Sequence, residues 1–224
     1  MAKMNSLDDL FVHELRDMYN AEKQITAALP RMAKATEAPE LKKAFETHLA
    51  ETEKQIERLE KCFELLGIPA RGKKCEGMAG IIEEGKSVLE MEGDANVIDA
   101  ALIASAQKVE HYEIGSYGTA IAWAEALGLT EVAEVLNETL AEEKAADEKL
   151  SALAESGINE AATAGESEDD MEEDEDDEER SASSGTSQGA GASARSASGA
   201  RAGNGAARSA SSGSKGTRQR GGRR

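Results

Sequence analysis

The chain has 224 residues and a formal net charge of −18, with 44 acidic and 26 basic residues. No apolar run is long enough to span a membrane and the first residues lack the apolar core of a signal peptide, so we expect a cytoplasmic protein without membrane contact. Without an export signal, Cys62 and Cys75 are expected to be reduced thiols. An acidic domain this poor in aromatic residues argues against nucleic-acid binding by the folded part.

The composition changes abruptly near residue 165 and divides the chain into three parts. Every Leu, Ile, Phe, Tyr and Trp precedes that point, and we expect residues 1–157 to form one domain with a hydrophobic core. Residues 158–179 form an acidic linker, in which twelve of the fourteen residues from 166 to 179 are Asp or Glu. Residues 180–224 carry nine Arg or Lys and no acid among Ser, Gly and Ala, which predicts a disordered basic tail.

The basic tail has two interpretations. Its cations could make weak, strongly salt-dependent contacts with nucleic-acid phosphates, although the tail lacks aromatic residues that would stack on bases. In the alternative interpretation the tail keeps the protein soluble, and its basic end folds back on the acidic linker.

The first predicted helix begins after Ser6, whose hydroxyl can cap it while Asp9 reaches back in a capping-box pattern. Glu22 fills the gap in the middle of the apolar stripe of this helix, so its carboxylate would be buried. Pro30 lies within the pattern and predicts a kink beyond Glu22. The stripe itself consists of Phe11, Leu15, Met18, Ile25, Leu29 and Met32.

The second predicted helix runs from Pro39 to Leu66. Its apolar stripe contains His48, and Glu51 lies three residues further along the same face. Residues 67–93 then form a long link with a short helical pattern of its own. A link of this length can carry the chain back along a bundle, as the single crossover of ferritin-like four-helix bundles does.

The third predicted helix runs from about residue 96 to residue 127. Its apolar stripe requires a core residue between Val109 and Tyr117, and that position is occupied by Glu113. Glu110 lies one turn earlier on the same face. This helix therefore also places carboxylates at core positions near its middle.

The fourth predicted helix begins with Thr130 as its cap. Glu143 and Asp147 occupy positions of its apolar stripe, and Glu142 lies beside them. A weak internal repeat aligns residues 48–52 with residues 139–143, and it favours Glu142 where the stripe favours Glu143. Both residues therefore stay candidates.

Acids in the apolar stripes of four long helices indicate a common site. Burying an unpaired carboxylate costs several kcal/mol, so such groups are normally paired or bound to a metal. Any one of them could instead be a boundary residue, but their coincidence near the middle of every helix favours a metal site. Carboxylates with one imidazole suit iron or manganese better than a structural zinc site. The nearby Tyr19, Tyr112 and Tyr117 could orient these carboxylates or simply pack in the core.

Five segments carry a family resemblance that covers residues 6 to about 157. Together they resemble the YciE/YciF-type ferritin-like stress proteins, a resemblance that implies a four-helix ferritin-like bundle, usually dimeric, with a di-iron centre and a role in bacterial stress responses. The segments are Tyr-Asn-Ala-Glu-Lys-Gln-Ile (19–25), His-Leu-Ala-Glu-Thr (48–52), Gln-Ile-Glu-Arg-Leu-Glu (55–60), Gln-Lys-Val-Glu-His-Tyr-Glu-Ile (107–114) and Glu-Thr-Leu-Ala-Glu-Glu-Lys-Ala-Ala-Asp (138–147).

The resemblance also implies a ligand set from all four long helices. It differs from the Glu-x-x-His pattern of ferritins, because the second helix reads His-x-x-Glu and the fourth has no His. The bridging candidates are Glu51 and either Glu142 or Glu143, and the remaining ligands would be terminal. The full set of metal-ligand candidates is Glu22, His48, Glu51, Glu110, Glu113, Glu142, Glu143 and Asp147.

We therefore expect an all-α ferritin-like bundle with a di-iron or di-manganese carboxylate site, a short extra helix in the crossover and a disordered tail. The expected chemistry is ferroxidase-like: ferrous iron is oxidised with dioxygen or peroxide as the acceptor. A protective stress role and a homodimer follow from the resemblance alone. The alternative is a non-catalytic stress or scaffold protein in which the acids form a buried network or hold a structural ion.

Overall fold

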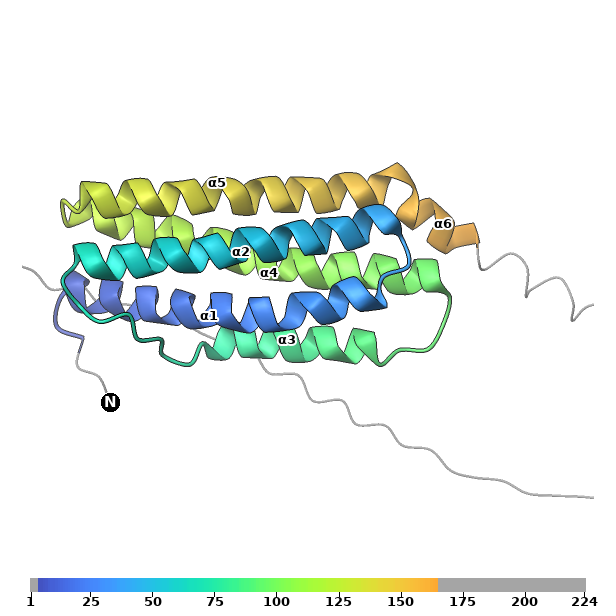
Figure 1. Cartoon of the computed structure of the whole chain (residues 1–224), viewed down its shortest axis with the longest axis horizontal. Helices are drawn as coiled ribbons and strands as arrows, with labels where there is room; N and C mark the ends of the chain where they lie inside the picture. Colours follow the sequence, from blue (N-terminus) through green and yellow to red (C-terminus); the bar gives the residue numbers. More distant parts are fainter. Residues whose placement is uncertain (1–3, 165–224) are drawn as a thin grey trace, which may run out of the picture. The chain divides into compact units, whose positions relative to one another are not determined.

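A computed structural model describes residues 4–164, and these residues form a bundle of α-helices (Figure 1). The four long helices are α1 (Leu7–Ala35), α2 (Pro39–Leu65), α4 (Ala95–Ala126) and α5 (Thr130–Leu153). The shorter α3 (Glu76–Leu89) lies in the connection between α2 and α4 and packs against α1 and α4. The predicted four-helix bundle with a crossover helix is confirmed.

The crossover decides the direction of the helices. The pairs α1–α2 and α4–α5 are joined by short turns, whereas the link from α2 to α4 carries the chain back along the bundle through α3 (Figure 1). As a result α2 and α4 run in the same direction, and so do α1 and α5. Each long helix packs against two others, because α2 also contacts α5 and α1 also contacts α4.

Two apolar clusters fill the bundle, one toward each end. The first cluster is built around Phe11, Leu15, Leu59, Phe63 and Leu136. The second is built around Ile25, Leu41, Phe45, Leu102 and Leu150. Each long helix carries one or two buried glutamates or a buried histidine, four glutamates and one histidine in all, that lie between its residues of the two clusters. The core is therefore divided by a polar layer, whose members are Glu22, His48, Glu110, Glu113 and Glu143.

The helix ends largely follow the predictions. The Ser6 hydroxyl accepts a hydrogen bond from the Asp9 backbone N–H at 3.1 Å, and the Asp9 carboxylate reaches back and accepts from the N–H of Asn5 at 3.0 Å. The first helix continues through Pro30 to Ala35. The predicted cap at Thr130 is wrong, because Leu129 is the capping residue and Thr130 already lies in the helix.

A buried aspartate ties the turn between the first two helices to α4. The carboxylate of Asp99 accepts hydrogen bonds from the backbone N–H groups of Glu37, at 3.2 Å, and Ala38, at 2.7 Å. These donors have no partner within α2, whose first residue is Pro39. The contact fixes one end of α4 against the start of α2.

The helical region extends past the predicted domain boundary at residue 157. A π-helical turn, η1 (Ala154–Ile158), follows α5, and α6 (Asn159–Ala164) continues beyond it. The rest of the predicted acidic linker and the whole basic tail lie outside the described residues. The homodimer and the nucleic-acid contact of the tail stay predictions.

Two further predictions concern the thiols and the membrane. Both Cys62 and Cys75 are free and buried, which confirms the prediction of reduced thiols. Within residues 4–164, no helix combines the length and the apolar character that a membrane span requires.

Truncating a core leucine tests the apolar clusters. Leu136 is 1% exposed, and we expect Leu136→Ala to lower the free energy of unfolding by about 2–5 kcal/mol, because it removes buried methyl groups and leaves a cavity. The matched control is Leu65→Ala: Leu65 is 41% exposed, and the change should stay within about 0.5 kcal/mol. Urea unfolding followed by circular dichroism measures both. Equal losses in the two variants would contradict this packing.

Candidate metal centre

Four side chains of the polar layer converge on one point. His48 from α2, Glu110 and Glu113 from α4 and Glu143 from α5 each offer one ligand atom, and these atoms lie within 4.8 Å of one another. Glu110 and Glu113 can share this site because residues three apart lie on one face of a helix. All four side chains are buried. One metal ion could contact all of them.

Glu22 from α1 extends this cluster. It is 1% exposed, and one of its carboxylate oxygens accepts a short hydrogen bond from the Tyr117 hydroxyl. Burial, followed by the charge of Glu143, raises the pKa of Glu22 to about 8, although the Tyr117 hydroxyl acts in the opposite direction. The fifth member of the layer is thus held in place by a hydrogen bond from α4.

The polar layer has too few hydrogen-bond donors for its acceptors. Neither ring nitrogen of His48 makes a hydrogen bond: Nε2 lies 3.3 Å from Glu110 Oε1, and Nδ1 lies 3.8 Å from Glu51 Oε2. Each unpaired buried polar atom costs about 1–3 kcal/mol. The buried carboxylate oxygens without a hydrogen-bond partner are Glu22 Oε2, Glu110 Oε2 and both side-chain oxygens of Glu113 and Glu143.

This shortage fits a metal ion. A divalent cation supplies to several oxygens at once the positive charge that hydrogen-bond donors do not provide. The donor atoms are carboxylate oxygens and one imidazole, which suit iron and manganese. Neither cysteine is in the set, because Cys62 belongs to an apolar cluster and Cys75 caps α3.

Burial also changes the proton affinity of the layer. It raises the pKa of Glu110 to about 8 and that of Glu143 to about 9, and it raises the pKa of Glu113 well above its usual range. Burial alone would lower the pKa of His48, but the neighbouring Glu51, Glu143 and Glu22 raise it overall. Protons and a metal ion therefore compete for the same oxygens.

The structure distinguishes Glu142 from Glu143. Glu143 is 0% exposed and lies in the polar layer, seven residues from both Leu136 and Leu150 on the buried face of α5. Glu142 turns instead to α2, where both of its oxygens lie 2.6 Å from the Arg58 guanidinium and one accepts from Gln55 at 3.1 Å. The apolar stripe identified the inward-facing acid, and the internal repeat did not.

Glu51 and Asp147 lie at the edge of the layer. The side chain of Glu51 is 38% exposed, and its Oε2 lies 3.8 Å from His48 Nδ1. Asp147 accepts from the Gln107 amide at 3.3 Å and pairs with His111 at 3.3 Å. The buried layer thus has two half-exposed acids beside it.

Only one of the three candidate tyrosines contacts a buried acid of the layer. Tyr117 donates to Glu22, whereas Tyr19 donates to Glu60 at 2.5 Å and Tyr112 donates to Asp17 at 2.9 Å. Sequence reasoning missed Gln55, which is 0% exposed and has a side-chain oxygen without a partner. Its place four residues before Leu59 on the buried face of α2 was the signal that could have identified it.

Comparison with known proteins identifies the family of this helical region. Residues 6–163 match a family described as a domain of unknown function, DUF892. The chain belongs to this family. It is also 49% identical over 160 residues to the protein YciF of Escherichia coli, a match that covers 71% of this chain and 96% of that protein. The resemblance predicted from the sequence segments is confirmed.

Solved structures agree with this assignment. The crystal structure of the E. coli stress protein YciF matches with a TM-score of 0.67 and covers 70% of this chain and 99% of that chain, at 49% identity. The YcfI protein of Rhodopseudomonas palustris matches with a TM-score of 0.65 at 46% identity, covering 66% and 95% of the two chains. A Xanthomonas campestris protein shares 27% identity with a TM-score of 0.55, covering 71% and 95%.

The stability of the metal-free protein should fall as pH rises. Each of the four buried glutamates of the polar layer has a folded-state pKa above the value of about 4.3 expected in the unfolded chain. The stability contributed by its protonated form is fully present below about pH 4 and is lost as pH rises through the folded-state values of about 8 to 9. We expect the free energy of unfolding to fall between about pH 5.5 and pH 9. For each acid the loss is on the order of 1.4 kcal/mol per unit of pKa shift. Urea unfolding after chelation measures it.

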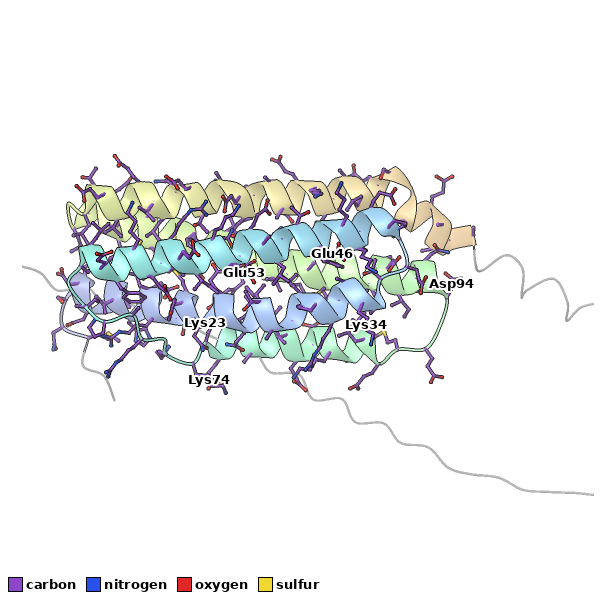
Figure 2. The ribbon with its side chains drawn as sticks, in the orientation of Figure 1. Lys23, Lys34, Glu46, Glu53, Lys74 and Asp94 are labelled. Carbon is purple, nitrogen blue, oxygen red and sulfur yellow. The ribbon has the colours of Figure 1, made fainter. Side chains whose placement is uncertain are left out.

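The replacement Glu113→Gln should make this pH dependence shallower and stabilise the metal-free protein at about pH 8 by at least about 1 kcal/mol, because the folded protein no longer has to keep one buried carboxyl protonated. The matched control is Glu53→Gln, an exposed residue of α2 that is labelled in Figure 2. This control should follow the parent at every pH. A parent protein whose stability does not change over this range would contradict the assignment.

Proposed function

We propose that the polar layer binds two divalent iron or manganese ions, and that the protein oxidises ferrous iron with dioxygen or peroxide in a protective stress response. The main support is the set of buried carboxylate oxygens that lack hydrogen-bond donors. Similarity to a protein described as a stress protein supports the physiological part.

A count of charges favours two ions over one. The layer contains four buried glutamates, and in their ionised forms they carry four negative charges. Two divalent ions balance this charge, whereas one ion leaves two uncompensated negative charges in a low-dielectric interior. The imidazole of His48 would bind as a neutral ligand.

The proposed ligand roles follow the neighbours of each acid. Glu143 interacts with His48 and Glu110 and also raises the pKa of Glu22, which is the position expected of a bridging carboxylate. Glu22 and Glu113 would then bind on one side, with His48 and Glu110 on the other. Glu51 and Asp147 would receive incoming cations at the exposed edge. Glu142 would not be a metal ligand, because its carboxylate is bound by the guanidinium of Arg58.

The chain would contribute to the reaction in four ways. Bound ferrous iron supplies the electrons that reduce dioxygen or peroxide, and hard carboxylate oxygens favour the ferric product. The Tyr117 hydroxyl fixes the orientation of Glu22, as outer hydrogen bonds commonly do for metal ligands. The two apolar clusters keep bulk water away from the layer. Acids with raised pKa values release protons when a cation binds.

Removing one carboxylate of the layer should weaken metal binding much more than removing the carboxylate of the adjacent residue in the sequence. We expect Glu143→Gln and Glu113→Gln to lower the metal affinity and the rate of oxygen uptake on addition of ferrous iron by at least about tenfold. Replacing a residue that only orients a metal ligand commonly costs this much, and replacing the ligand itself should cost at least as much. Metal content is measured by elemental analysis, and oxygen uptake with an electrode.

The matched control is Glu142→Gln, which changes the adjacent residue but lies outside the layer. It should retain metal content and oxygen uptake close to those of the parent. The rival, a non-catalytic scaffold protein, predicts no oxygen uptake by the parent. It also predicts that a metal-free protein with both His48 and Glu51 replaced is as stable as the parent.

A further inference from the structure

A cavity of about 320 Å³ lies beside the polar layer, with walls from all five helices α1–α5. This volume is at the lower end of the range for small-molecule sites, about 300–1,000 Å³. Most of the wall is apolar, with Leu29, Phe45 and Leu150 among its residues. His48 and Glu110 of the polar layer also line it, so the cavity adjoins the candidate metal centre.

Small side chains account for the space. Each of the five helices contributes at least one to the wall, and no larger residue fills the room that they leave. At Gly85, an added Cβ would lie 3.8 Å from the nearest atom, Ser105 Cβ, which is ordinary contact. The small residues from the five helices include Ala28, Ala44, Gly85, Ala106 and Ala146.

A cation lies at the other end of the cavity. Arg31 lines it nine residues after Glu22, which at the helical rise corresponds to about 13 Å along α1. Among residues 4–164, Arg31 makes no ion pair or hydrogen bond, although the protein is strongly acidic. Two more cations line the cavity: Lys86 pairs with Glu83 at 2.6 Å, and Lys149 lies near Glu51, where its positive charge helps to lower the pKa of that carboxyl.

We propose that this cavity binds a medium-chain aliphatic carboxylate. The carboxylate head pairs with Arg31, the chain lies along Leu29, Phe45 and Leu150, and its far end points toward His48 and Glu110. The apolar part of the wall is stabilised by a ligand that covers it and displaces water from it. Its volume accommodates about ten groups of the size of a water molecule or methylene, so a ten-carbon acid matches it.

This proposal goes beyond the oxidation of iron and does not depend on it. Binding is a property of the cavity walls and of Arg31, and it is measured on the protein without iron addition. Failure to bind the acid would leave the proposed iron chemistry untouched, and failure of oxygen uptake would leave the acid site untouched.

Titration calorimetry of the full-length protein with decanoate tests the site. We expect one decanoate per chain, with an affinity at least about tenfold higher than that for decanol or butyrate, because charge pairing and chain burial both contribute. Arg31→Gln should weaken decanoate at least about fivefold and leave decanol unchanged. Equal binding of decanoate and decanol would overturn the role of Arg31.

Filling the cavity provides the decisive control. Ala28→Leu and Ala106→Leu each place extra carbon atoms in the space, and each should weaken decanoate binding at least about tenfold. Ala28 is half-buried at the cavity wall, so its variant keeps the test valid if the fully buried Ala106 variant is unstable in thermal melts. The same change at Ala101, half-buried on α4 but outside the cavity, should bind as the parent does.

Two results would overturn the proposal. One is the absence of saturable decanoate binding to the parent. The other is equal binding by the parent, the two cavity-filling variants and the Ala101→Leu control, which would show that the acid associates with the surface of the protein.

Discussion

The structure depends on the compensation of negative charge in the middle of an apolar bundle. Glu22, Glu110, Glu113 and Glu143 lie together with His48, and most of their oxygens have no donor. In a low-dielectric interior such charges are stable only when a proton or a cation neutralises them. The layer would otherwise destabilise the fold. The layer lies between two apolar clusters and could hold a metal ion that supplies this positive charge.

The crossover makes the convergence possible. It reverses the chain before α4, so that the helix with two layer acids can face Glu22 on α1 and His48 on α2. Contacts around the crossover hold this arrangement. Lys73 pairs with Asp17 of α1 at 2.8 Å, and Tyr112 of α4 donates to the same carboxylate. Gly77 of α3 is required there, because a Cβ would come within 2.8 Å of the Tyr112 ring.

The same crossover helix also forms part of the cavity wall. The small and aliphatic residues of α3, which packs against α1 and α4, line one side of this cavity, and the cavity is partly open to solvent. The candidate metal centre thus adjoins an apolar cavity, and this combination motivates the test with an aliphatic acid.

Much of the fold and part of the site could be predicted from the sequence. Apolar periodicity located the long helices to within about two residues, and it identified Glu22, Glu113 and Glu143 as acids at core positions, because a helix of fixed pitch presents every third or fourth residue to one face. Only the tertiary structure decided between Glu142 and Glu143, since Arg58 comes from another helix. It also decided which tyrosine reaches the layer, that Glu51 and Asp147 stay at its edge, and that a cavity remains beside it. Periodicity describes the faces of one helix, whereas distances between side chains of different helices depend on how those helices pack.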